Sequence, residues 1–186
     1  MNNESKILTI PAFASADECY ELIKRYDLTS ELQNAGVYNE HNYIKLKETR
    51  KSKVSFVFNI GLIQNRILDK VKEHIGTLKG YEPSLDDFQF TKYEEGDYFD
   101  WHIDSNDTIF KDRFYTIVLQ LNNSYVGGEF QLRMNREITL ESGIGNLFIF
   151  PSETIHRVTP IKSGIRYSLV NWLKLKPLHN IKKTLL

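Results

Sequence analysis

Residues 93–104 read Y-E-E-G-D-Y-F-D-W-H-I-D and decide how the rest of this chain is interpreted. The stretch has the composition of a β-strand that ends in polar residues. Alternate residues of a strand project from the same face, so Tyr98, Asp100, His102 and Asp104 are expected to share one face. His102 and Asp104 could then bind one metal ion, an imidazole nitrogen beside a carboxylate oxygen. The pair alone is weak evidence, because a surface histidine near an acid has the same appearance.

Two residues further along the chain strengthen the metal-site hypothesis. His156 stands in P-S-E-T-I-H-R-V-T-P, 54 residues after His102, in a second stretch with strand composition. Arg166 follows ten residues later in G-I-R-Y-S-L-V-N-W, which is otherwise mostly apolar. A buried arginine needs a partner, and a carboxylate suits it best because the planar guanidinium binds it with two hydrogen bonds. The pattern therefore predicts a metal ion held across two strands and an arginine that binds a carboxylate.

Length and composition limit the classes of protein to consider. The chain has 186 residues, 41% of them hydrophobic, so we expect one domain over 1–186. Lys+Arg and Asp+Glu both number 24, and this zero net charge argues against a nucleic-acid partner or an acidic membrane surface. Cys19 is the single cysteine and is expected to be a small buried hydrophobe, which fits a cytoplasmic protein. The start resembles no signal peptide, and no apolar run reaches the ~18 residues that span a bilayer.

The N-terminal part, about 1–82, contains two predicted helices. Ser15 with Glu18 three residues later forms a capping box, and apolar residues follow at helical spacing. A second amphipathic pattern begins near residue 60 and is expected to end near Gly80. Short strands are predicted at 6–10 and 54–58.

The segment 37–53 between the helices is polar and basic. Its composition favours a solvated loop or hairpin. The alternative is a mobile flap that closes over an active site and meets the substrate, with Arg50 as the candidate contact.

From about residue 83 the sequence pattern changes and predicts short strands separated by turns. Candidate strands lie at 88–93, 102–104, 114–121, 129–133, 138–140, 147–150, 154–159 and 165–173. Several short strands at this spacing suggest a sandwich or barrel rather than alternating strands and helices. The stretch 114–121 is mostly apolar and is expected to be a central strand.

The order of His-x-Asp, about fifty residues, His, and ten residues to Arg resembles the Fe(II)/2-oxoglutarate dioxygenases. Within that superfamily, 93–104 together with G-N-L-F-I-F-P-S at 145–152 looks like the prolyl 4-hydroxylase-like members of bacteria and viruses. The resemblance covers about 88–173. It implies a mainly β fold, a double-stranded β-helix (jelly roll) core at about 83–175, flanked by the N-terminal α-helices.

The resemblance also implies roles for individual residues of the site. His102, Asp104 and His156 would bind Fe(II), and Arg166 would bind the 5-carboxylate of 2-oxoglutarate. Three coordination positions stay open for 2-oxoglutarate and O2. The implied reaction hydroxylates a C–H bond and releases succinate and CO2, with ascorbate as an optional reductant. The implied substrate is a prolyl residue in a protein or peptide, and a free amino acid or other small molecule is the alternative.

Further positions come from the same resemblance. Tyr93 would line the 2-oxoglutarate pocket, although a core tyrosine is an equal alternative. Gln120 stands where some members carry a tyrosine near the 5-carboxylate, so Thr116 or Ser168 could replace that contact. Trp172 would lie near the pocket or simply in the core.

Parity within the strand gives two more expectations. Tyr98 should line the substrate side of the site, and Trp101 should pack away from the metal. His41, His74 and His179 have no ligand-like neighbours and are expected to be surface or structural residues.

Two other functions compete with the hydroxylase. A nucleic-acid demethylase of the AlkB type would carry a second arginine shortly after Arg166, and 167–172 contain none. A non-catalytic jelly-roll binding domain would not bind 2-oxoglutarate. The sequence does not decide the oligomeric state.

Overall fold

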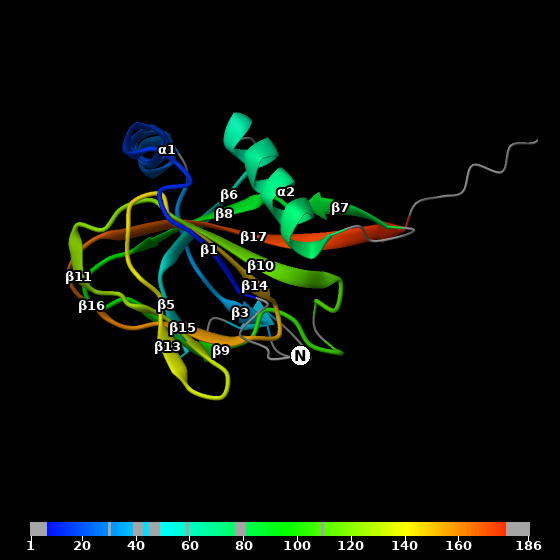
Figure 1. The fold of residues 1–186 in the computed structure, drawn as a ribbon. Helices are drawn as coiled ribbons and strands as arrows, with labels where there is room; N and C mark the ends of the chain where they lie inside the picture. The colour runs from blue at the N-terminus through cyan, green and yellow to red at the C-terminus, as the bar shows by residue number, and fades with distance from the viewer. Residues whose placement is uncertain are drawn as a thin grey trace, which may run out of the picture.

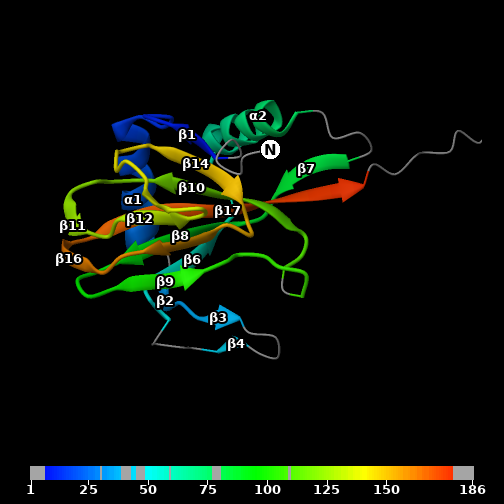
Figure 2. The ribbon, with the colours of Figure 1, turned by 60° about the horizontal axis from the view of Figure 1, so that its bottom comes forward.

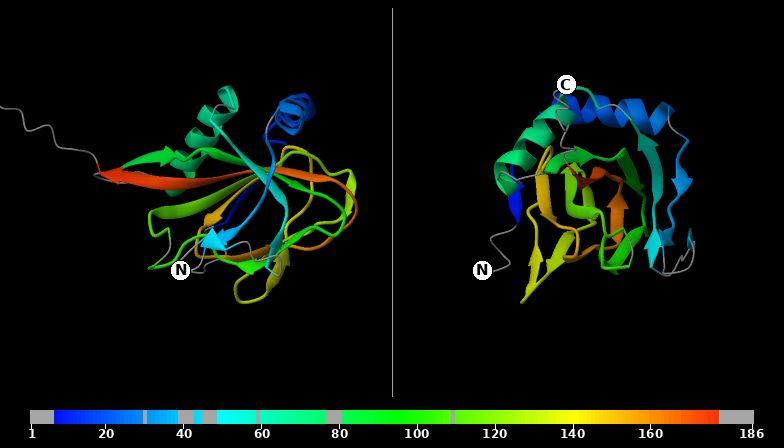
Figure 3. Two further views of the ribbon diagram at one scale, coloured as in Figure 1. Left: turned by 180° about the vertical axis from the view of Figure 1, so that it is seen from behind. Right: turned by 90° about the vertical axis from the view of Figure 1, so that its right-hand side faces the viewer.

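The computed structural model describes residues 7–29, 31–38, 43–44, 49–58, 60–76, 81–108 and 110–177, and only the backbone of 37–38 and 43–44. Two sheets face each other, and both helices lie on the outer side of the larger sheet (Figures 1 and 3). This arrangement confirms the expected mainly β jelly roll with N-terminal helices. Predictions for His41, for His179 and for the residues after 177 fall outside the described part of the chain.

Helix α1 (Ala16–Thr29) begins at the predicted capping box. The backbone N–H of Ser15 donates to Glu18 Oε2 at 2.8 Å, and that of Glu18 donates to Ser15 Oγ at 3.2 Å. Helix α2 (Leu62–Ile75) ends earlier than the expected Gly80. Gly76 takes a positive φ of 70°, which glycine adopts without strain, and its N–H caps the carbonyl of Lys72 at 3.1 Å. Within the described ranges, no helix is long and apolar enough to cross a membrane.

The larger sheet has eight strands in the order β1-β14-β10-β17-β8-β6-β2, with β7 paired to β17. Its strands are β1 (Leu8–Ile10), β2 (Gln33–Asn34), β6 (Lys53–Val57), β7 (Tyr81–Leu85), β8 (Phe88–Tyr93), β10 (Arg113–Gln120), β14 (Leu147–Pro151) and β17 (Arg166–Pro177). The predicted central strand 114–121 is β10, which lies between β14 and β17. The N-terminal strands β1 and β6 extend this sheet, so the first part of the chain contributes strands as well as helices.

The smaller sheet has five strands in the order β13-β12-β15-β9-β5. Its strands are β5 (Arg50–Lys51), β9 (Tyr98–His102), β12 (Phe130–Arg133), β13 (Glu137–Thr139) and β15 (Ile155–Val158). Two further antiparallel pairs are β3 (Val37–Tyr38) with β4 (Tyr43–Ile44), and β11 (Tyr125–Gly127) with β16 (Ile161–Gly164) (Figure 2). The β3–β4 pair matches the hairpin that 37–53 suggests, while 39–42 and 45–48 of that segment lie outside the described residues.

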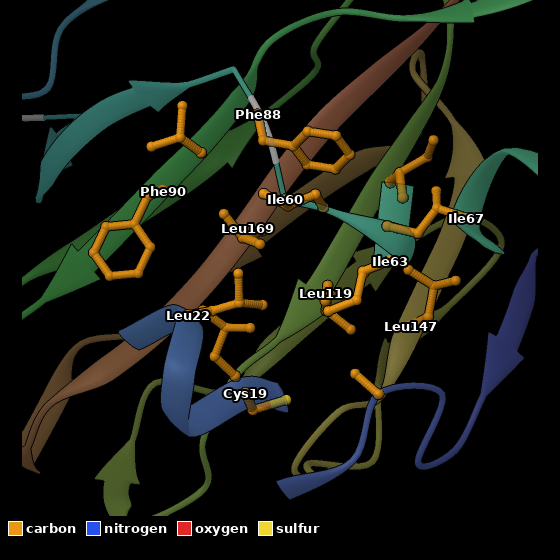
Figure 4. Packing of buried hydrophobic residues seen from close by; sticks show 14 of the residues in the cluster. Cys19, Leu22, Ile60, Ile63, Ile67, Phe88, Phe90, Leu119, Leu147 and Leu169 are labelled. Carbon is orange, nitrogen blue, oxygen red and sulfur yellow. The ribbon is translucent and has the colours of Figure 1, made fainter. Parts of the chain in front are cut away.

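Alternate residues of the larger sheet face opposite sides. Leu119 of β10 and Leu169 of β17 point toward the helices, where they pack with Cys19 and Ile67 (Figure 4). Cys19 is therefore the small buried hydrophobe that its helical position predicts. This apolar cluster draws on both the helical part and the strands of the chain. Its composition supports one domain over 1–186, which stays a prediction.

A second apolar cluster lies between the two sheets. Val118 of β10 and Phe148 of β14 meet Phe130 of β12 and Val158 of β15, together with Tyr93. This cluster forms the wall of the space in which the candidate site lies.

Candidate metal centre and its cavity

Three predicted ligands meet at the end of the smaller sheet. His102 ends β9 and pairs across the ladder with His156 of β15, so the two imidazole rings lie 4.0 Å apart between centroids. Asp104 Oδ1 lies 3.6 Å from His102 Nε2, and Asp104 Oδ2 lies 3.4 Å from His156 Nε2. All the candidate ligand atoms lie within 4.8 Å of one another. Two imidazoles and one carboxylate form the ligand set of a non-haem Fe(II) site.

Backbone carbonyls fix the orientation of both rings. Nδ1 of His102 lies 2.7 Å from the carbonyl oxygen of Asp100, and Nδ1 of His156 lies 2.8 Å from that of Thr154. A carbonyl only accepts, so Nδ1 of each ring donates and Nε2 keeps its lone pair. Such outer hydrogen bonds hold metal-binding histidines in the productive tautomer.

Thr116 orients the third ligand. Its hydroxyl donates to Asp104 Oδ2 at 2.7 Å and lies 3.0 Å from Ser152 Oγ, while the backbone N–H of Asp104 donates to the carbonyl of Ser152 at 2.9 Å. Thr116 thus supports a candidate metal ligand, and its expected contact with the 2-oxoglutarate 5-carboxylate stays a prediction. Thr116 pairs with Trp172 across β10 and β17, six residues along β17 from Arg166.

The protonation states of His102 and Asp104 suit a bound cation. Burial, helped by the nearby His156, holds the pKa of His102 well below its ordinary value. Burial by itself would raise the pKa of Asp104, but the two histidines and the Thr116 hydrogen bond outweigh it and hold that pKa below the ordinary range. Around neutral pH, Asp104 is therefore ionised and His102 is neutral.

Arg166 is the buried cation that the sequence predicts, with only 1% of its surface exposed. Its Nη1 donates to Ser168 Oγ at 3.1 Å, whereas Nε and Nη2 are buried without a hydrogen-bond partner among the described residues. The guanidinium carbon lies 5.5 Å from the centre of the Tyr93 ring. Unpaired donors on a buried guanidinium are costly unless an anion binds them. This observation fits a carboxylate ligand.

One cavity of about 590 Å³ connects Arg166 with the candidate metal ligands. Tyr93, Thr116, Ser168, Trp172 and Arg50 also line it, as the sequence analysis expects of residues near the site. The volume lies within the range of small-molecule binding sites.

Gln120 does not line this cavity, although it lies on the cavity side of β10. Its amide nitrogen donates to the carbonyl of Asn122 at 2.9 Å and to Ser142 Oγ at 2.6 Å. These partners occupy the amide group of Gln120. A contact between Gln120 and the cosubstrate stays a prediction.

Tyr98 does not line the cavity either, and Phe99 takes the place expected for it. The register shifts between β9 and β15, with Phe99 opposite Val158 and His102 opposite His156. This irregularity reverses the parity of the strand, so the Phe99 ring stacks on His102 with a centroid distance of 3.4 Å.

Trp101 packs away from the ligands, as parity predicts. Its ring lies between the guanidiniums of Arg133 and Arg157, at 4.0 and 4.3 Å.

Arg113 is a cavity residue that the sequence analysis misses. It begins β10, and its guanidinium carbon lies 3.8 Å from the centre of the Phe110 ring and 3.7 Å from that of Trp172. An arginine at the polar start of a strand resembles any surface arginine in the sequence. The nearby aromatic residues become informative only once β17 brings Trp172 alongside.

Comparison with known proteins shows which class of protein this part of the chain resembles. Residues 88–174 match the model of the 2OG-Fe(II) oxygenase superfamily. The match runs from β8 to β17 and contains both histidines, the aspartate and the arginine described above. This part of the chain therefore resembles a domain of that superfamily, and the candidate metal ligands lie within the matched residues.

The similarity is more specific among curated proteins. A PKHD-type hydroxylase of Shewanella oneidensis is 34% identical over 92 residues, which are 46% of this chain and 41% of that protein. A PKHD-type hydroxylase of a Synechococcus species is 34% identical over 83 residues, 42% of this chain and 37% of that protein. This chain thus spans about two fifths of the length of these relatives.

Solved structures with a similar fold include several prolyl hydroxylases. One is a prolyl hydroxylase from Trichoplax adhaerens, solved with a peptide fragment of the hypoxia inducible factor oxygen degradation domain (TM-score 0.74, 18% identity, 92% of this chain and 84% of that chain). Another is a Pseudomonas putida prolyl-4-hydroxylase (TM-score 0.69, 22% identity, 91% and 92%). A third is the viral collagen prolyl hydroxylase of Paramecium Bursaria Chlorella virus-1 (TM-score 0.69, 21% identity, 91% and 96%). At these identities the likeness shows the fold.

Proposed function

We propose that this protein is an Fe(II)- and 2-oxoglutarate-dependent dioxygenase that hydroxylates a C–H bond, with release of succinate and CO2. The observation that carries the proposal is the shared cavity. A two-histidine, one-carboxylate group lies at one part of it, and the buried, incompletely bonded guanidinium of Arg166 lies at another. A metal ion and a dicarboxylate together would satisfy both.

The residues fit these two groups in chemistry and in charge. His102, Asp104 and His156 would hold Fe(II), and Arg166 with Ser168 would hold the distal carboxylate of 2-oxoglutarate. The metal and the cosubstrate, once bound, supply the activation of O2 and the oxidative decarboxylation. Fe(II) carries +2, Asp104 −1, 2-oxoglutarate −2 and Arg166 +1, so the assembled site is neutral. A largely apolar cavity tolerates a neutral assembly far better than a charged one.

The rest of the protein orients and shields this chemistry. The carbonyls of Asp100 and Thr154 direct both imidazoles toward the metal, and Thr116 fixes the carboxylate. Phe130 lies against His156, with ring centroids 5.9 Å apart, and lines the cavity between the metal ligands and Arg166. Apolar walls of this kind exclude water from a site where reactive species form.

For the substrate, we propose a prolyl residue in a protein or peptide. The support is the shared fold with prolyl hydroxylases, one of which was solved with a peptide. A free amino acid or another small molecule is the alternative, since fold does not fix substrate. The single cysteine and the balanced charge support a cytoplasmic location and argue against a nucleic-acid partner.

Succinate formation from 2-oxoglutarate tests the enzyme class directly. Protein loaded with Fe(II) without air should form succinate when air is admitted, and a proline-rich peptide should increase the rate. The protein with His156→Ala is the matched control and should form none. If the wild type forms no succinate and calorimetry detects no 2-oxoglutarate binding, the non-catalytic jelly roll is the better description.

A further inference from the structure

Arg50 is a second buried cation that lines the cavity, in addition to Arg166. It belongs to β5 and pairs with Phe99 of β9. Its side chain is largely enclosed, with 8% of the residue exposed, yet it lines the cavity. The guanidinium carbon lies 4.4 Å above the Phe99 ring, and that ring stacks on His102 at 3.4 Å with an interplanar angle of 11°. The Phe99 ring therefore contacts both Arg50 and the candidate metal ligand His102.

The neighbouring cations on the same segment have acidic partners, and Arg50 has none among the described residues. Lys51 Nζ lies 3.1 Å from Asp97 Oδ1, and Lys53 Nζ lies 2.8 Å from Glu94 Oε2. For Arg50 the structure gives one hydrogen bond, from Nε to Ser52 Oγ at 2.9 Å, and the contact with the Phe99 ring. Its two terminal nitrogens have no hydrogen-bond partner in the described part of the chain. They are not among the fully buried atoms that lack a partner, so they are accessible to a ligand in the cavity that Arg50 lines.

The sum of the charges in the assembled site also indicates that Arg50 lacks an anionic partner. Fe(II), 2-oxoglutarate, Asp104 and Arg166 together would sum to zero, so none of these groups offsets the charge of Arg50, and Arg113 adds a further positive charge to the cavity lining. Asp104 is the only carboxylate among the described residues that line the cavity, and it is committed to the metal. None of the described cavity residues therefore supplies an anion for Arg50, and a ligand that enters the cavity could supply one.

We propose that Arg50 binds a carboxylate of the substrate, so that the substrate of this enzyme is acidic next to the carbon that reacts. The inference rests on the proposed function and narrows its substrate. Only the Phe99 ring separates Arg50 from His102, so a carboxylate bound to Arg50 would lie close to the candidate metal ligands. Two sources share this chemistry, the α-carboxylate of a free amino acid and an acidic side chain next to a proline in a peptide.

Two matched pairs of probes distinguish the sources. One pair is L-proline and L-prolinamide, and the other is a capped tetrapeptide with Pro-Glu at its centre and the same peptide with Pro-Gln. Each is titrated calorimetrically into zinc-loaded protein saturated with 2-oxoglutarate, which prevents turnover and keeps the probes away from Arg166. In at least one pair, the carboxylate should bind about tenfold or more tightly than its amide, since a charged hydrogen-bonded pair with a buried guanidinium is lost.

The variant Arg50→Gln should abolish this preference, while Arg50→Lys should keep part of it. The matched control is Lys51→Gln, which removes a neighbouring cation whose charge is already paired and should preserve the preference. Equal affinities for carboxylate and amide overturn the inference, as does a preference that survives Arg50→Gln or a failure to bind any of the four probes. The 2-oxoglutarate titration that precedes each experiment is independent, so its success together with any of these results leaves the proposed function standing.

Discussion

The two faces of the larger sheet are formed by the same strands but have different roles. One face packs against the helices in the core, and the other lines the cavity of the candidate site. On β17, Leu169 and Leu173 face the helices in a mainly apolar cluster. On the same strand, Arg166 and Ser168 face the smaller sheet, where buried donors lack partners. Alternation along a strand thus separates the residues that stabilise the fold from those that bind ligands. The helix-facing side should tolerate little change in volume, and the cavity-facing side should lose binding before it loses stability.

The largest expected effect is on the cavity-facing side, at His156. His156→Ala should abolish turnover and lower the affinity for Fe(II) or Zn(II) by orders of magnitude, because two ligands cannot complete the group. Metal binding is measured by equilibrium dialysis and stability by thermal unfolding of the metal-free protein. The comparison predicts an unchanged or higher unfolding temperature for the metal-free variant. A large fall in that temperature, with metal affinity retained, would contradict the assignment.

The corresponding change on the helix-facing side is Leu169→Ala. Leu169 is completely buried, so the free energy of unfolding should fall by about 2–5 kcal/mol. Urea unfolding measures this loss. The metal affinity of the folded protein should stay within a few-fold of wild type, and a loss of metal binding in folded protein would show that the two faces are coupled.

Arg166→Met sharpens the comparison, since it replaces a buried cation by an apolar side chain of similar length. The affinity for 2-oxoglutarate should fall by about 2–5 kcal/mol, the usual cost of removing one partner from a buried charge pair. The ligand-free protein should be no less stable, because Nε and Nη2 have no partner there. Calorimetric titration measures the affinity for 2-oxoglutarate, and urea unfolding measures the stability. An unchanged affinity would show that another residue binds the carboxylate.

Thr116→Val is expected to have a smaller effect, because it removes a hydroxyl that supports a ligand but does not itself bind the metal. Loss of such an outer hydrogen bond typically lowers metal affinity by about 10–100-fold. Thr116→Ser should restore most of the affinity, which distinguishes a hydrogen bond from simple packing. If the valine variant binds metal as tightly as the wild type, Asp104 needs no support from β10.

The smallest effect concerns a residue of the helix-facing cluster. Burial raises the pKa of the Cys19 thiol to about 11, so the thiolate that reacts with alkylating reagents is scarce at pH 8. Native protein should therefore react slowly with iodoacetamide, and unfolding in urea should restore a normal rate. The rate in native protein should rise as the pH approaches 11. Rapid alkylation at pH 8 without urea would show that this face opens readily.

The regular parts of the fold could be predicted from the sequence, and the irregular parts could not. The capping box of α1 and the central strand β10 have local signals, namely Ser15 with Glu18 and an apolar run at 114–121. Tyr98 is the instructive failure. A register shift in β9 reverses the parity that placed it in the site, and no residue type between Phe99 and His102 announces that shift.

The binding residues divide in the same way. The metal ligands and Arg166 have fixed spacings, so a pattern finds them. The roles of Thr116 and Gln120 depend on which side-chain partners the folded chain brings within reach, Asp104 for one and Ser142 for the other. Arg50 became informative only through its burial and through the lack of a carboxylate partner among the described residues around it.

The position of β9 in the smaller sheet has a consequence for local unfolding. β9 pairs with β15 on one side and with only the two residues of β5 on the other. A metal bound to His102 and His156 would join β9 to β15 as a staple between neighbouring strands. Amide hydrogens of β9 should then exchange with solvent far more slowly in the metal-loaded protein, while those of β10 and β17 exchange at the same rate with or without metal. Release of the metal should therefore increase local unfolding of β9, while the other strands of the jelly roll stay folded.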